Sequence, residues 1–94
     1  MSGIRELLRN EPKPVTIMGE AMLLRRPSAL DLIEALDIAA REPSRVRVWL
    51  VATHALDAAG ERLFESMEAA LAAPAGIVNA IADEAEKLYG EGRD

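Results

Sequence analysis

Residues 15–28 read Val15-Thr-Ile-Met-Gly-Glu-Ala-Met-Leu-Leu-Arg-Arg-Pro-Ser28, and they are the most informative stretch of the chain about its fold. It opens with alternating strand-forming residues, and Gly19-Glu20 suits a type II′ turn, which takes glycine at its first central position. Residues 21–25 would then return antiparallel to the first strand. The stretch therefore predicts a β-hairpin within residues 14–26.

A helix is predicted directly after the hairpin. Ser28 is a good N-cap, and Asp31 follows three residues later in a capping-box-like arrangement. The helix is expected to run to about Arg41, since Pro43 cannot continue it. Its apolar residues recur at helical spacing, which is typical of a stripe that packs on a core. They are Ala29, Leu30, Leu32, Ile33, Leu36 and Ala40.

Three further helices are predicted in the rest of the chain. Residues 44–55 are apolar nearly all round, which is typical of a central, buried helix. Trp49 is expected to anchor this helix in the core rather than to form an exposed binding hot spot. A turn at Gly60 leads to a short helix over residues 67–73, which a proline ends. The closing helix is predicted over residues 75–89.

The sequence as a whole predicts a mainly α fold, namely a small helical domain of about four helices with an N-terminal β-hairpin. The 94 residues suffice for one domain with a modest core. We expect a flexible or short-helical arm over residues 1–13 and a single domain over residues 14–90. Residues 91–94 are expected to form a disordered tail.

Composition and charge exclude several classes of protein. The net charge is −5, and residues 51–94 hold nine acidic residues against three basic ones. This acidic half argues against nucleic acid as the main ligand, because phosphate binding needs a basic face. The chain has no cysteine, no apolar run near the ~18 residues of a membrane span, and no signal-peptide core at its start. We therefore expect a cytoplasmic protein that does not enter a membrane.

The sequence contains no residue pattern that indicates catalysis, a cofactor or a metal. His54 is the only histidine, and without cysteine a zinc site would need carboxylates. We expect His54 to be a half-exposed structural residue. Ser28, Ser44 and Ser66 each precede a helix, so capping explains them better than nucleophilic attack. The sequence therefore predicts a protein that is not an enzyme.

Candidate partner-binding residues gather near the hairpin and at the start of the second long helix. Met18 and Met22 flank the hairpin turn, where they either cover the core or form an adaptable contact surface. Two pairs of arginines could form local basic patches, although solvated charges are the simpler interpretation. The predicted contact set is Met18, Met22, Arg25, Arg26, Arg45 and Arg47.

The order of the motifs carries a family resemblance. Leu24-Arg-Arg-Pro-Ser28 precedes the first long helix, and Trp49-Leu-Val-Ala-Thr-His-Ala-Leu56 covers the end of the second. Asp57-Ala-Ala-Gly-Glu-Arg-Leu-Phe64 follows, and the closing helix ends in Leu88-Tyr-Gly90. Across residues 14–90 this order resembles the small tail assembly chaperones of long-tailed bacteriophages and related prophage elements.

The resemblance implies a non-enzymatic protein made in the cytoplasm of an infected bacterium. Such chaperones keep the long, largely helical tape measure protein soluble, help to recruit tail tube subunits, and are absent from the finished virion. Many are also made in a longer form by ribosomal frameshifting. The family has no catalytic residues to transfer to this chain. Self-association into a homo-oligomer, as a ring or an open stack, is compatible with an exposed hairpin.

Two other functions stay open on the sequence. A small helical regulator or adaptor, similar to an antitoxin, would need a basic recognition helix. The helix over residues 44–55 is too apolar for that role apart from Arg45 and Arg47. A structural head–tail component is the second alternative, and it would be found in purified virions, whereas a chaperone would not.

Overall fold

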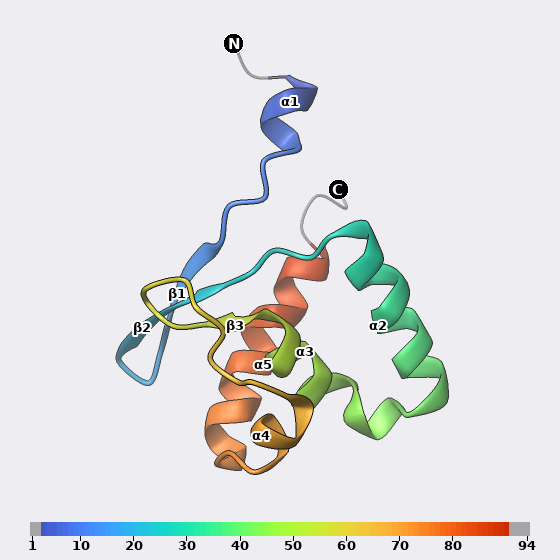
Figure 1. The fold of residues 1–94 in the computed structure, drawn as a ribbon, viewed down its shortest axis with the longest axis vertical. Coiled ribbons are helices and arrows are strands. Elements are labelled where there is room, and N and C mark those ends of the chain that lie inside the picture. The colour runs from blue at the N-terminus through green and yellow to red at the C-terminus, as the bar shows by residue number, and fades with distance from the viewer. Residues whose placement is uncertain (1–2, 91–94) are drawn as a thin grey trace.

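Figure 1 shows the computed structural model of the chain, which describes residues 3–90. Most of the chain is helical, so the prediction of a mainly α fold is confirmed. In chain order the elements are helix α1 (Ile4–Leu7), strands β1 (Lys13–Ile17) and β2 (Glu20–Leu24), helix α2 (Ala29–Arg41), the 3₁₀ helix η1 (Pro43–Arg45), helix α3 (Val46–His54), strand β3 (Ala55–Leu56), and helices α4 (Met67–Leu71) and α5 (Ala75–Gly90).

The hairpin is part of a three-stranded antiparallel sheet, which the sequence did not predict. Strand β2 is central, with β1 on one side and β3 on the other. Strand β3 starts at Ala55, directly after α3, so the predicted helix over residues 44–55 ends one residue early. Leu24 pairs with Ala55, and both are almost completely buried. The pairing satisfies backbone groups of β2 that would otherwise lie buried without partners.

The hairpin turn lies one residue earlier than predicted. Ile17 pairs with Glu20, so Met18 and Gly19 are the two central residues of the turn. Both have positive φ, 51° and 83°, as a type I′ turn requires. The strand register explains why the turn lies one residue earlier. With this pairing, Ile17 and Met22 both lie on the face of the sheet that packs on the core. Glycine accepts positive φ without steric cost, whereas Met18 does so against the preference of its side chain.

Helix α2 begins and ends as predicted, but its apolar stripe faces solvent and not the core. The Oγ of Ser28 accepts a hydrogen bond from the Asp31 amide, and the Asp31 carboxylate accepts one from the Ser28 amide, so the capping box is confirmed. The helix buries Asp31 and Ile38. The apolar stripe expected to pack on the core is instead exposed, at Leu30, Leu32, Ile33 and Leu36.

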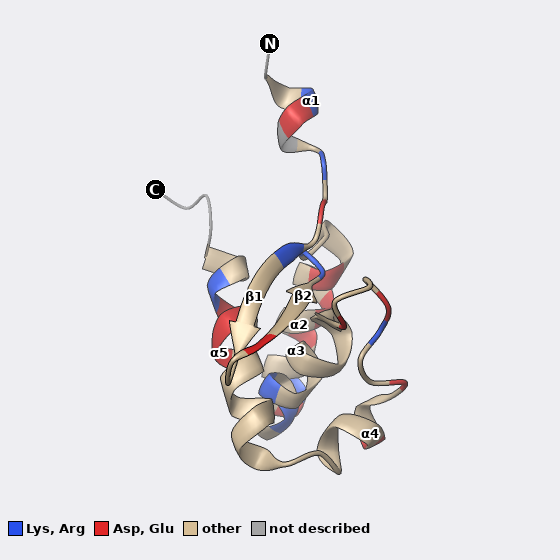
Figure 2. Cartoon of the chain, turned by 90° about the vertical axis from the view of Figure 1, so that its left-hand side faces the viewer, with Lys and Arg blue, Asp and Glu red and all other residues tan. Residues whose placement is uncertain are grey.

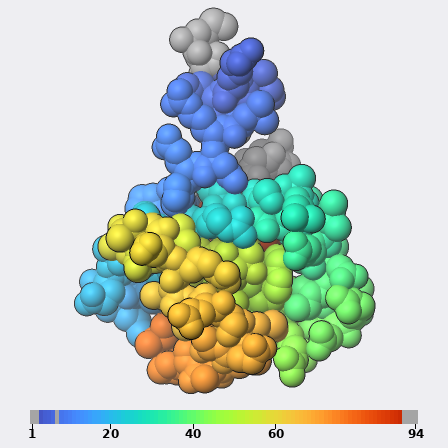
Figure 3. Space-filling model, viewed as in Figure 1, coloured from blue at the N-terminus to red at the C-terminus, as the bar shows by residue number. Residues whose placement is uncertain are grey.

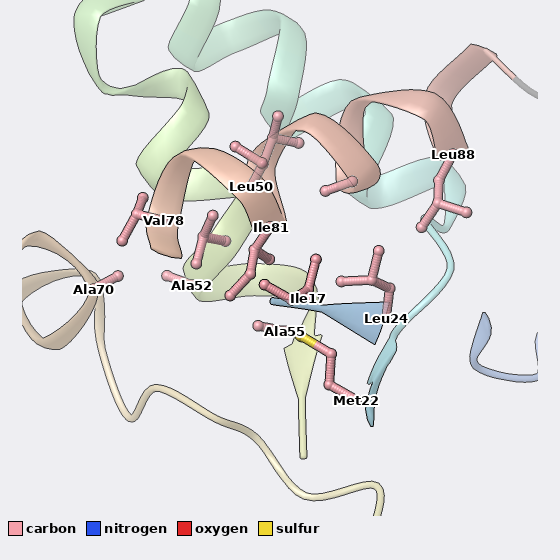
Figure 4. Close-up of a cluster of buried hydrophobic side chains, with 13 residues drawn as sticks. Ile17, Met22, Leu24, Leu50, Ala52, Ala55, Ala70, Val78, Ile81 and Leu88 are labelled. Carbon is pink, nitrogen blue, oxygen red and sulfur yellow. The ribbon is translucent and has the colours of Figure 1, made fainter. Parts of the chain in front are cut away.

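The core lies between α3, α5 and the inner face of the sheet (Figure 4). Helix α3 packs against α5 and α4, which confirms that it is the central helix. Leu24, Val51 and Ile81 are the largest fully buried apolar side chains. Trp49 is half-buried and packs against this core, so its role as an anchor is confirmed.

Only two of the three expected serine caps are present. The Oγ of Ser66 accepts a hydrogen bond from the Ala69 amide at 3.2 Å and caps α4. Ser44 instead lies inside η1 and caps no helix, so that prediction is wrong. Pro43 starts this tighter 3₁₀ turn, and α3 then continues from it without a conventional N-cap.

The two ends of the chain differ from the helical body. Helix α1, within the arm predicted over residues 1–13, stands clear of the other elements (Figure 3). Gly90 is the last residue of α5, and the predicted tail over residues 91–94 lies outside the described residues. Within residues 3–90 no helix is both long enough and apolar enough to cross a membrane.

Candidate functional site

An apolar groove lies beside the tip of the hairpin. It has a volume of about 250 Å³ and runs between the hairpin, the segment after β3 and the start of α5. Its lining is almost entirely apolar. We call it the hairpin groove and define it by Ile17, Met18, Met22, Leu63, Ile77 and Ile81.

The two methionines of the predicted contact set occupy different parts of this groove. Met22 is 7% exposed and contributes to the core between the sheet and α5 (Figure 4). Met18 is 67% exposed at the turn. Its side chain reaches the start of α5, because a Cβ added to Gly76 would lie 3.8 Å from Met18 Cε. Met22 therefore covers the core, whereas Met18 forms an accessible rim of the groove.

The surface around the hairpin carries little charge. In β1 and β2, the charged residues are Lys13 at the start of β1 and Glu20 at the start of β2, as Figure 2 shows for the face turned toward the viewer. Among the residues that line the groove, the charged ones are Glu20 and Asp57. An apolar side chain from another molecule could therefore enter the groove without removing many polar groups from water.

Arg25 is held in an internal ion pair. Its guanidinium donates two hydrogen bonds to the Asp31 carboxylate, at 2.8 and 3.2 Å, and a third to the Thr53 carbonyl at 3.3 Å. Burial alone would raise the pKa of Asp31, but the hydrogen bonds from Arg25 and from the Ser28 amide outweigh burial and lower it. Arg25 therefore fixes the start of α2 to the body of the protein.

His54 forms a buried polar network that the sequence analysis missed. Its Nδ1 lies 2.7 Å from the Arg25 carbonyl and its Nε2 lies 2.6 Å from the Tyr89 hydroxyl. Because a carbonyl only accepts, Nδ1 carries the proton and the Tyr89 hydroxyl donates to Nε2. Burial lowers the pKa of His54 and raises the pKa of Tyr89. His54 is completely buried, so the expectation of a half-exposed residue is wrong.

The remaining arginines of the predicted set also have partners within the chain. Arg26 donates from Nε to the Glu11 carbonyl at 3.0 Å. Arg45 lies 3.5 Å from a carboxylate oxygen of Glu42. Arg47 forms ion pairs with Asp83, at 2.7 Å, and with Glu86, which tie α3 to α5; both partners also help to raise its pKa. Met18 and Met22 thus lie at the hairpin, Arg25 and Arg26 between β2 and α2, and Arg45 and Arg47 in η1 and α3. The role of these six residues in binding stays a prediction.

The exposed apolar surface of α2 is the feature that the predicted contact set omits. We call it the α2 face and define it by Leu30, Leu32, Ile33 and Leu36, of which three are 63–65% exposed and Leu32 is 47% exposed. Hydrophobic periodicity identifies this stripe but does not say which way it faces. A capping Asp31 that also pairs with Arg25 must face the body, and residues two and five positions later lie on roughly the opposite side of a helix.

The described part of the chain shows no metal site. Among residues 3–90, no group of three or more His, Asp or Glu side chains is placed to hold a metal ion. The titratable groups with shifted pKa values, such as His54 and Asp31, lie in the internal network and do not line the hairpin groove.

Comparisons with known proteins return nothing that bears on identity. None of the protein-family models, curated proteins and solved structures compared with this chain matches it. The resemblance to phage tail assembly chaperones therefore rests on the order of the sequence motifs, and the function that it implies is a proposal.

Proposed function

We propose that this chain is a non-enzymatic tail assembly chaperone that binds the tape measure protein of a long-tailed phage through the hairpin groove. The observation that carries the proposal is Met18, a bulky residue with φ of 51° whose exposed side chain overhangs an apolar groove. Asparagine or glycine would suit this turn position better. A strained residue at such a place indicates a contact role.

The groove fits a short apolar segment of a client. Its volume of about 250 Å³ is small, so it would take the large side chains that an amphipathic helix presents on one face. The flexible thioether of Met18 can adapt to different apolar side chains, which suits a client that offers many similar segments. Each contact would be weak, and many copies along one long client would hold it firmly.

The charge distribution is compatible with this role. Helix α5 carries Asp83, Glu86 and Lys87 on its exposed side, and the acidic half of the chain would keep a complex with an apolar client in solution. In this proposal the complex forms in the host cytoplasm and later recruits tail tube subunits. A nucleic-acid adaptor is less well supported, because Arg45 and Arg47 are each paired with carboxylates.

Co-expression with a tape measure protein, sought as a long helical open reading frame next to the gene for this chain, tests the proposal. We expect the client to become soluble and to co-purify with many copies of this protein. The Met18→Asn variant should bind the client about 10-fold or more weakly, since burial of a methionine side chain stabilises a contact by roughly 1.5–3 kcal/mol. The same variant should fold about 0.5–1 kcal/mol more stably, because asparagine tolerates positive φ.

Leu71→Asn is the matched control, because Leu71 is an exposed apolar residue on α4, outside the groove. It should leave the amount of co-purified client unchanged. A client that stays insoluble while this protein elutes alone would overturn the proposal. Mass spectrometry of purified virions separates the chaperone, which should be absent, from a structural head–tail component, which should be present.

A further inference from the structure

The N-terminal arm carries apolar side chains that are exposed among the residues that the structure describes, 3–90. Helix α1 has four residues, which is far below the length at which an isolated helix is stable in water. Ile4 and Leu8, four positions apart and therefore on the same side, are 69% and 73% exposed. Figure 3 shows this segment standing out from the body. A short helix of this kind gains stability by docking on another surface.

The base of the arm is fixed so that α1 points away from the body. The Asn10 side chain donates to the Arg26 carbonyl at 3.3 Å, and Arg26 Nε donates to the Glu11 carbonyl at 3.0 Å. Pro12 and Pro14 restrict the backbone next to these bonds. The arm is therefore directed outward from the body of the protein.

The α2 face offers a complementary surface. Its four large apolar side chains are exposed and lie on a helix of 13 residues, long enough to cover the four residues of α1. The charges are also opposite in sign. Around α1, residues 3–9 carry Arg5 and Arg9 against Glu6, which pairs with Arg9, so Arg5 is the base that remains for a partner. On α2 and its C-cap, Asp37 pairs with Arg41 and Glu42 with Arg45, so Glu34 is the acid that remains for a partner.

We propose that the arm of one copy of this chain docks on the α2 face of the next copy, with Ile4 and Leu8 packed against Leu30, Ile33 and Leu36. In a head-to-tail arrangement each added copy leaves one arm and one face free, so growth continues, whereas a reciprocal exchange of arms between two copies would stop at a dimer. The proposed contact is the head-to-tail one, and the series of species seen in solution distinguishes the two. This contact lies outside the hairpin groove and stands independently of the client proposed above.

The association is expected to be weak for a single pair. A contact made mainly by a four-residue helix buries less than the ~1,600 Å² of a stable complex. Self-association should therefore depend on concentration, and copies held next to one another on a scaffold would dock more readily.

Sedimentation velocity on the full chain from roughly 1 µM to 1 mM tests this contact. The wild-type chain should shift from monomer to a series of larger species. Leu8→Glu removes the arm contact and Leu36→Glu removes the face contact, so each variant alone should stay monomeric. Both residues are exposed, and circular dichroism should show unchanged helix content. Leu71→Glu, an equivalent change on α4, should associate as the wild type does.

A mixture of the two variants gives the decisive result. Leu8→Glu keeps an intact α2 face and Leu36→Glu keeps an intact arm, so an equimolar mixture should form a heterodimer and nothing larger. A wild-type chain that stays monomeric at 1 mM would overturn the proposal. So would a monomeric mixture, or a Leu8→Glu variant that still dimerises, because the latter would indicate a symmetric contact between two α2 faces.

Discussion

At the scale of single residues, the buried network around His54 links three parts of the chain. His54 ends α3, Tyr89 lies near the end of α5, and the Arg25 carbonyl follows β2. Every described buried side-chain nitrogen or oxygen has a hydrogen-bond partner. Such a network is stable only while each member keeps its protonation state.

This network predicts a loss of stability in mild acid. The pKa of His54 is lowered from 6.5 in the folded chain, mainly by burial, so the unfolded chain binds protons more strongly. The free energy of unfolding should therefore be highest above pH 6.5 and should fall as the pH drops below it. Urea unfolding at several pH values measures this effect.

The His54→Gln variant is the control for the acid effect. It should be less stable than the wild type at neutral pH but should show little change between pH 7 and 5. Both proteins should lose stability below pH 3.8, because the pKa of Asp31 is also lowered from that value. Equal slopes for the two proteins between pH 7 and 5 would exclude His54 as the responsible group.

At the scale of elements, α2 is held to the body by few interactions. Asp31 connects it to Arg25 and caps it, and Ile38 is its one buried apolar residue. Asp31→Ala should therefore lower the free energy of unfolding by roughly 1–3 kcal/mol, since it removes a cap and leaves a partly buried arginine without its carboxylate. Amide hydrogen exchange should accelerate in α2 more than in α5.

A neighbouring ion pair supplies the control for this change. Asp37 and Arg41 form an exposed pair four residues apart on the same helix, and such pairs contribute little to stability because water screens them. Asp37→Ala should hardly change amide exchange in α2. If Asp31→Ala were equally mild, the pairing with Arg25 would not be what positions the helix.

The same elements show what the sequence could and could not predict. The hairpin, the capping box of α2 and the central position of α3 follow from local patterns, and they are present. The outward direction of α2 depends on an ion pair between residues six apart, which hydrophobic periodicity cannot detect. The position of the turn depends on which residues of both strands face the core, a tertiary property.

The hairpin groove was predicted only in part. Met18 and Met22 were singled out because they flank the turn, and both line the groove. The opposite wall comes from Leu63, Ile77 and Ile81, which are distant in the sequence, so no local pattern could assign them to the same site. The ion pairs of Arg25 and Arg47 could not be predicted from the sequence, because their carboxylate partners lie on other elements.

At the scale of the whole molecule, the two proposed contacts should respond differently to salt. Residues 3–9 around α1 and the exposed charged residues of α2 have net charges of opposite sign, whereas the hairpin groove is almost entirely apolar. Raising the ionic strength from about 0.05 to 0.5 M should weaken self-association several-fold, because exposed charges are screened. Client binding should be unchanged or slightly stronger. Sedimentation and client pull-down at the same salt concentrations measure the two contacts, and a parallel loss of both would contradict this separation.

The β1 edge of the sheet has a consequence for how the protein behaves in the proposed chaperone role, beside an aggregation-prone client. Strand β1 is the outer strand of the hairpin, and it begins with Lys13 and Pro14. A proline lacks the amide hydrogen that a further strand would need, and a lysine on an edge disfavours stacking of like strands. An extended segment of another chain therefore cannot easily add to the β1 edge of this sheet. The molecule can stay at high concentration next to exposed apolar chain without acting as a template for amyloid-like growth.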